Sequence, residues 1–221
     1  MVEATLDKLA KPRLRGVFHQ WAFFVALIAG GVLVVLAPSG RATFATFVYA
    51  AGLAALFGVS AVYHRVNWTS ADARRWMRRL DHSMIFFMIA GTYTPFALLV
   101  LDGALATVIL VVVWSGALAG VILNLAWVEA PKWVTAVVYL TLGWVAVVAF
   151  PDLISELGWP AALLLGAGGL LYSLGAVVYA LKRPDPAPSV FGYHEVFHVL
   201  VIAAAALQYA VVAFYVLPEA G

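Results

Sequence analysis

Seven apolar stretches divide this chain of 221 residues, and each is about long enough to cross a membrane. A helix needs roughly 17 to 25 residues to cross the hydrocarbon core of a bilayer, where its backbone groups must be hydrogen-bonded within the segment. The sequence therefore predicts an all-α integral membrane protein, a bundle of seven transmembrane helices. The predicted spans are residues 20–37, 43–63, 81–101, 104–127, 133–150, 159–181 and 193–217.

The composition agrees with this prediction and excludes some functions. Hydrophobic residues make up 65% of the chain and charged residues only 11%, whereas soluble domains carry roughly 25% charged residues. Because the chain has no cysteine, any metal must be held by His, Asp or Glu, and the small net charge of +2 gives no reason to expect a nucleic-acid partner. Six of the eight tryptophans lie near proposed helix ends, as an aromatic belt requires: Trp21, Trp68, Trp76, Trp127, Trp133 and Trp159.

The basic residues are distributed unequally between the two membrane sides of a seven-helix bundle. Twelve of the thirteen Lys and Arg residues fall on one side, and Arg41 alone falls on the other. The positive-inside rule therefore places the amino terminus in the cytosol and the carboxyl terminus outside. This predicts a cytosolic tail at residues 1–19, a transmembrane domain at 20–217 and an external tail at 218–221.

Two histidines, His194 and His198, stand four residues apart at the start of the last predicted span. Four residues are about one helical turn, so both rings project from one face, roughly 6 Å apart along the axis. This spacing is typical of two nitrogen ligands of one metal ion, and zinc suits imidazole; the alternative is two interfacial histidines that share a face by chance. The same residues match the HExxH pattern of metalloproteases, in which Glu195 would be a general base. Its place at the membrane boundary favours instead a first-turn acid that the helix dipole stabilises.

Further ionisable residues lie at the same predicted end of the helices, namely His19, His64, Asp81 and His82. Such groups are costly in a membrane and often mark functional sites. His64 with His194 and His198 would provide three neutral nitrogen ligands, and a water in the fourth position is typical of catalytic zinc. Zinc would make that water a nucleophile. Asp81 would accept its proton or orient it, and Ser60 would hydrogen-bond the water or the developing oxyanion.

Each of these residues also has a simpler interpretation. His64 would be an interfacial residue in contact with water, Ser60 would hydrogen-bond the backbone of its own helix, and Asp81 would be the N-cap of the third helix. His19 and His82 have no partner at a diagnostic spacing, so we interpret both as interfacial residues. The residues alone leave these alternatives open.

Taken together, three motifs resemble the signature of the progestin and adiponectin receptor family, in particular its bacterial hemolysin III branch. They are Ser60-x-x-x-His64, Asp81, and His194-x-x-x-His198 at the start of the seventh span. The resemblance implies a seven-helix bundle in the bacterial plasma (inner) membrane, with zinc held by the three histidines. It also implies that Asp81 and Ser60 lie beside the zinc-bound water.

The resemblance implies a lipid as substrate or ligand and leaves more than one function open. In eukaryotic relatives the family is tied to ceramide hydrolysis, so the first hypothesis is a zinc-dependent lipid hydrolase that cleaves an amide or ester bond. The second is a sensor or receptor of membrane lipid or fluidity with structural zinc, in which a basic loop at residues 65–79 contacts anionic headgroups. The hemolysin name adds membrane damage as a further alternative, which the motifs do not explain.

Overall fold

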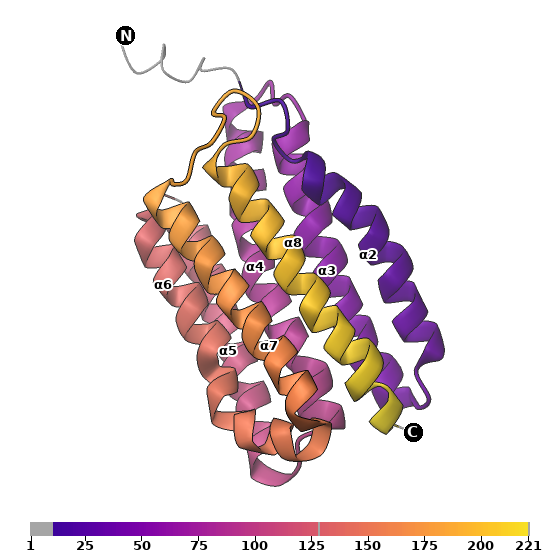
Figure 1. Ribbon diagram of the computed structural model, residues 1–221. Helices are drawn as coiled ribbons and strands as arrows, with labels where there is room; N and C mark the ends of the chain where they lie inside the picture. The colour runs from indigo at the N-terminus through magenta and orange to yellow at the C-terminus, as the bar shows by residue number, and fades with distance from the viewer. Residues whose placement is uncertain (1–10, 128, 221) are drawn as a thin grey trace.

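The computed structural model describes residues 11–127 and 129–220, and these form a bundle of roughly antiparallel helices (Figure 1). The amino-terminal residues 1–10, which include Lys8 of the predicted basic tail, and Gly221 of the predicted external tail lie outside the described residues. The main helices are α2 (Val17–Leu36), α3 (Gly40–Arg65), α4 (Ala71–Leu99), α5 (Gly103–Ala126), α6 (Lys132–Gly143), α7 (Phe150–Leu181) and α8 (Tyr193–Val211). Shorter helical segments are η1 (Trp144–Ala149), η2 (Val212–Val216) and η3 (Pro218–Ala220).

Within the described residues, six helical stretches are long and apolar enough to cross a membrane. Five are single helices or a helix with its short extension, and the sixth is a continuous run of 49 residues, Trp133–Leu181, where the sequence predicts two spans. Inside this run the chain passes from α6 through the 3₁₀ segment η1 into α7, and Gly158 adopts a non-helical φ of 80°. Figure 1 shows α6 and the upper part of α7 side by side, with the chain turning back between them at the lower end of the bundle.

Helix α4 begins ten residues earlier than the sequence predicts. Its first residue is Ala71, and the Ser70 hydroxyl caps the first turn by accepting a hydrogen bond from the Ala73 amide at 3.3 Å. A helix start at Asp81 is therefore wrong, and the predicted basic loop at 65–79 is mostly helix, with a connection only at 66–70. Hydropathy misses the extension because its arginine-rich residues carry no apolar periodicity, whereas Ser70 is a good capping residue.

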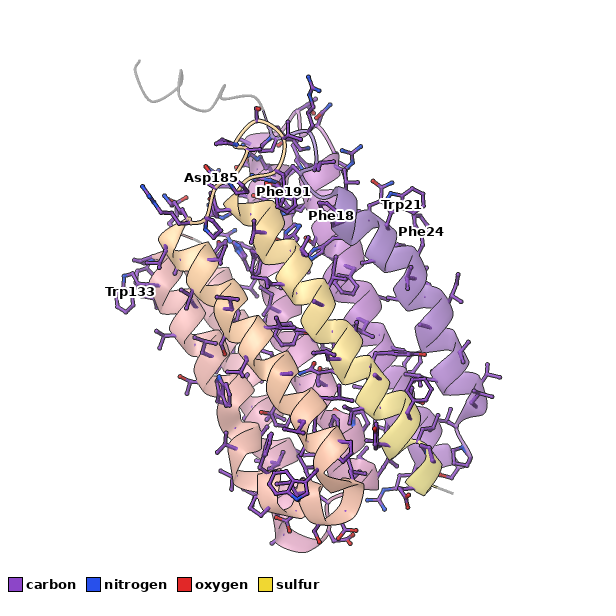
Figure 2. The ribbon with its side chains drawn as sticks, viewed as in Figure 1. Phe18, Trp21, Phe24, Trp133, Asp185 and Phe191 are labelled. Carbon is purple, nitrogen blue, oxygen red and sulfur yellow. The ribbon has the colours of Figure 1, made fainter. Side chains whose placement is uncertain are left out.

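The segment before α2 is fixed against the end of the bundle where α3 finishes and α8 begins. Arg13 and Leu14 donate backbone hydrogen bonds to Ser189 and Val190, each at 3.1 Å. Phe18 meets Phe191 edge-on at 5.8 Å, close to the same end in Figure 2. The chain thus brings its first described residues and the α7–α8 connection together.

Gly16 allows this segment to approach α3 closely. Its φ is 78°, a conformation that glycine adopts without the strain other residues incur. A Cβ atom added at Gly16 would lie 2.6 Å from Cβ of His64. The backbone at Gly16 therefore packs directly on His64, a predicted metal ligand.

Gly116 and Gly120 of α5 pack closely against two neighbouring helices. A Cβ at Gly116 would lie 2.6 Å from Leu142 of α6, and one at Gly120 would lie 2.3 Å from Phe86 of α4. Small residues let helices approach closely in a membrane, where lipid provides no hydrophobic drive for association.

The outer surface of the bundle is apolar. Trp21 and Phe24 project from the outer face of α2, and Trp133 projects from the start of α6 (Figure 2). Trp21 is 66% and Trp133 65% exposed. Such side chains suit contact with lipid and its headgroup boundary.

Candidate metal centre

Three imidazole rings converge at one end of the bundle. His64 lies in the last turn of α3, and His194 and His198 lie in the first two turns of α8. One nitrogen from each ring lies within 4.8 Å of the other two, and Nε2 of His64 is 3.1 Å from Nε2 of His194. The end of α3 and the start of α8, the second and last predicted spans, therefore lie side by side, as the three-histidine prediction requires.

The start of α8 places its two histidines. The helix begins at Tyr193 because Gly192 is its N-cap, and the Glu195 carboxylate accepts the Gly192 amide hydrogen at 2.9 Å. This bond, the Glu195 half of a capping box, holds the first turn, and His194 and His198 lie one turn apart on the side that faces α3. His198 and His64 are buried, and His194 is half-buried.

The donor set fits a metal ion. Four-coordinate metals such as zinc bind imidazole nitrogen at 2.0–2.1 Å, which separates two nitrogens by about 3.3 Å in a tetrahedral site. The spacing of 3.1 Å between His64 and His194 is close to this value. Nδ1 of His198 is buried and has no hydrogen-bond partner among the described residues. Two ring nitrogens that face each other need either a proton or a cation between them, so this cluster is suited to a cation.

Asp81 lies beside the cluster and is not a helix cap. Its Oδ2 atom is 4.0 Å from Nε2 of His64, and its side chain is nearly buried. Because α4 begins at Ala71, Asp81 is three turns into the helix, and the N-cap interpretation is wrong. The carboxylate can reach a small molecule held at the histidines.

Ser60 is held by a residue that the sequence analysis treats as interfacial. The Ser60 hydroxyl forms a hydrogen bond of 2.8 Å with Nδ1 of His19, and it also interacts with the Asp81 carboxylate. Ser60 is buried one turn before His64 on α3. The hydroxyl is therefore turned toward the cluster rather than bonded only to its own helix.

His19 is the residue at this centre that sequence reasoning missed. It is only 3% exposed, so its interpretation as an interfacial residue is wrong. Its ring stacks on that of His198, with centroids 3.7 Å apart and planes 9° from parallel. No motif marks His19, because its burial depends on how α2 packs against α8. His82 also lines the cavity described below, and its Nε2 atom is 3.3 Å from the hydroxyl of Tyr179.

The Glu195 carboxylate makes contacts that hold the start of α8 in place. It is fully buried, one carboxylate oxygen pairs with the Arg15 guanidinium, and the other accepts the Gly192 amide hydrogen. Both oxygens are thus engaged within the protein, which agrees with the first-turn interpretation and leaves no free carboxylate for the metalloprotease role. Sequence reasoning did not find Arg15, which lies 180 residues away in the chain.

A largely apolar cavity leads from the histidines into the bundle. His194, His198, Ser60 and Asp81 line one end, and further residues such as Ile85, Met88, Phe96 and Val201 line its length. Along α4 the lining residues extend from Asp81 to Phe96, about 22 Å at 1.5 Å per residue. This is most of the hydrocarbon thickness of a bilayer, about 30 Å. The cavity has the length and character of a site for an acyl chain.

Comparison with known proteins identifies relatives over most of the chain. The family model described as Haemolysin-III related matches residues 8–209, which include the whole histidine cluster. Hemolysin-3 of Bacillus cereus is 32% identical over 182 residues, which cover 82% of this chain and 80% of that protein. The Monocyte to macrophage differentiation factor of Homo sapiens is 29% identical over 194 residues, 86% of this chain and 78% of the relative.

Proposed function

The chain belongs to the haemolysin-III-related family, and from this premise we propose that it is a zinc-dependent hydrolase of membrane lipids. The observation that carries the proposal is the position of the His64, His194 and His198 cluster at the polar end of an acyl-sized cavity. This arrangement favours a lipid whose amide or ester bond lies at the cluster while its acyl chain lies among the helices.

Zinc is the metal that the donor set favours. Three neutral imidazoles without a thiolate, in a chain without cysteine, suit zinc, and three protein ligands leave one position for water or substrate. When bound, zinc supplies Lewis acidity and lowers the pKa of water toward roughly 7. The buried histidines provide neutral nitrogens, and the surrounding apolar side chains exclude bulk water.

The chain's own residues provide the remaining chemistry. Asp81 accepts a proton from the attacking water and passes it to the leaving group, the usual role of a carboxylate within reach of the reacting atoms. The Ser60 hydroxyl donates a hydrogen bond to the oxygen on which negative charge develops. His19 holds Ser60 in this orientation through the bond at 2.8 Å.

We further propose that the protein crosses the bacterial plasma membrane seven times, with its amino terminus in the cytosol. The turn at Gly158 supports two crossings by the 49-residue run, and the start of α2 and the last described residues, Pro218–Ala220, lie at opposite ends of the bundle (Figure 1). The end that holds the histidines carries most of the basic residues, which agrees with the positive-inside rule. The metal site would then lie at the inner leaflet.

A second candidate is a lipid sensor in which zinc is structural. The observation that favours it is the arginine-rich start of α4, which includes Arg74, Arg75, Arg78 and Arg79 and projects beyond the apolar part of the helix. Such a surface attracts anionic headgroups. This candidate keeps the metal but requires no turnover.

The experiment that separates these candidates combines metal analysis with lipid analysis. Purified wild type should contain about one zinc ion per chain, and His64→Ala and His198→Ala should lose it. Zinc-loaded wild type should release fatty acid from ceramide or phospholipid, measured by mass spectrometry. Zinc-loaded protein that releases no fatty acid from a broad lipid panel would contradict the hydrolase, and a metal-free wild type would contradict both candidates.

A further inference from the structure

A second group of polar atoms lies deep in the bundle, far from the histidines. The hydroxyls of Tyr49 and Tyr172 and the side-chain oxygen Oε1 of Gln208 are buried, and none has a hydrogen-bond partner among the described residues. These residues come from three helices, α3, α7 and α8. Tyr49 is fully buried.

The three side chains are neighbours. Tyr172 and Gln208 line the same cavity as the histidines. One turn before Tyr172 is Gly168, where an added Cβ would lie 3.4 Å from Cγ of Gln208, so the glutamine packs on this face of α7. Tyr49 lies near both Tyr172 and Tyr209. We call these three residues the mid-cavity polar site; Tyr172 and Gln208 line the cavity, and Tyr49 lies near Tyr172.

Two helices give the same separation between this site and the metal centre. Gln208 follows His198 by ten residues on one continuous helix, about 15 Å at 1.5 Å per residue. Tyr49 precedes Ser60 by eleven residues on α3, about 16 Å. An extended covalent chain advances about 1.2 Å per bond, since a residue of three bonds spans 3.3–3.6 Å. The separation therefore corresponds to about twelve or thirteen bonds.

Unpaired polar atoms at this depth require a partner from outside the chain. Nearly all buried polar groups in proteins are hydrogen-bonded, and lipid provides no donor or acceptor to replace water. The neighbouring Tyr209 shows the ordinary arrangement, since its hydroxyl donates to the Ala29 carbonyl at 3.0 Å. Phenylalanine would fill the positions of Tyr49 and Tyr172 without any unpaired group. Tyr172 and Gln208, which line the cavity, are thus placed for an occupant of it.

We propose that the mid-cavity polar site binds an oxygen-bearing group, a hydroxyl above all, in the middle of the substrate's acyl chain. A hydroxyl offers one hydrogen and two lone pairs, so it can donate to Oε1 of Gln208 and accept from a tyrosine hydroxyl. The oxygen would lie about twelve bonds from the carbonyl carbon held at the histidines. This inference rests on the proposed function, which places an acyl chain in the cavity, and it narrows the substrate to lipids with a mid-chain hydroxyl.

The test compares the binding of two fatty acids, octadecanoate and its 12-hydroxy derivative, to purified zinc-loaded protein by competition with a fluorescent fatty acid. One additional hydrogen bond should make wild type bind the hydroxylated acid about three- to tenfold more tightly. The ratio of the two affinities should fall close to one in Tyr172→Phe and in Gln208→Met. The matched control, Tyr209→Phe, also loses a tyrosine hydroxyl, but one already paired within the protein, so it should keep the wild-type ratio.

The outcomes separate this inference from the function on which it rests. Equal affinities in wild type would overturn the inference and leave the hydrolase proposal intact. A preference for the hydroxylated acid that survives both Tyr172→Phe and Gln208→Met would also overturn the inference, because these side chains would then not bind the hydroxyl. Binding of neither fatty acid would overturn the acyl-chain site itself. Thermal unfolding of each variant confirms that the compared proteins are folded.

Discussion

Replacing Glu195 with glutamine separates a structural role from a catalytic one. Glutamine keeps an oxygen that can accept the Gly192 amide hydrogen, and it keeps nearly the same volume in a fully buried position. It replaces the oxygen that pairs with Arg15 by an uncharged amide nitrogen, which cannot accept a hydrogen bond from the guanidinium. If Glu195 only holds the start of α8 in place, zinc-loaded Glu195→Gln should hydrolyse lipid at close to the wild-type rate.

The loss of stability can be worked out from the two contacts. A hydrogen bond to a charged group contributes about 1.5–3 kcal/mol, and Glu195→Gln loses the one to Arg15 while it keeps the one to Gly192, so it should lower the free energy of unfolding by about 1.5–3 kcal/mol. Glu195→Ala removes both contacts and leaves Arg15 without its partner, and it should cost about 4–6 kcal/mol, the sum of a broken buried pair and a lost cap.

The assay is equilibrium unfolding in mixed micelles together with turnover per zinc-loaded molecule. In the double variant Arg15→Met with Glu195→Gln, the two costs should not add, because both substitutions remove the same ion pair. Wild-type stability combined with a rate at least a hundredfold lower in Glu195→Gln would refute the structural reading and restore the metalloprotease-like role.

Three further predictions concern the metal centre and its surroundings. Asp81→Asn should keep its zinc, measured by mass spectrometry of metals, but should release fatty acid about 10²–10⁴ times more slowly, because the proton acceptor is lost; an unchanged rate would exclude that role. Zinc at a hundredfold excess over its dissociation constant should stabilise the apoprotein by about 2.7 kcal/mol in thermal unfolding, and His198→Ala should show no such response; an equal response would place the ion elsewhere. Gly16→Ala should destabilise the fold and weaken zinc binding, because the new Cβ meets His64 at 2.6 Å. The control is Gly103→Ala, which has a similar positive φ of 60° but open space around the added Cβ and should leave zinc affinity unchanged.

The sequence predicts the parts of the fold that depend on local composition. Long apolar stretches are recognisable because lipid requires them, and the spacing of His194 and His198 follows from the helical period. The start of α4 at Ala71 was missed because a solvated, arginine-rich helix has the same composition as a basic loop. The 3₁₀ segment at Trp144–Ala149 and the turn at Gly158 were likewise not predicted, and they join two predicted spans into one helical run.

The site could be predicted only in part, because its residues meet through tertiary contacts rather than local patterns. His64 is predicted to join the cluster because it lies at the same end of the helices, and a family resemblance supports this; no local pattern links it to a helix 130 residues away. The burial of His19 and the pairing of Arg15 with Glu195 depend on packing between the first and last helices. Contacts of this kind arise from tertiary structure and leave no period or spacing in the sequence.

The long separation of the three histidines in the chain has a consequence for biogenesis. His64 precedes His194 by 130 residues, and ribosomes add about 5–20 residues per second, so roughly ten seconds pass between the synthesis of the two. Arg15 and His19 are made earlier still and must wait for the same final helix. A nascent chain that still lacks α8 cannot bring the three histidines together, so the complete donor set forms only after α8 has been synthesised.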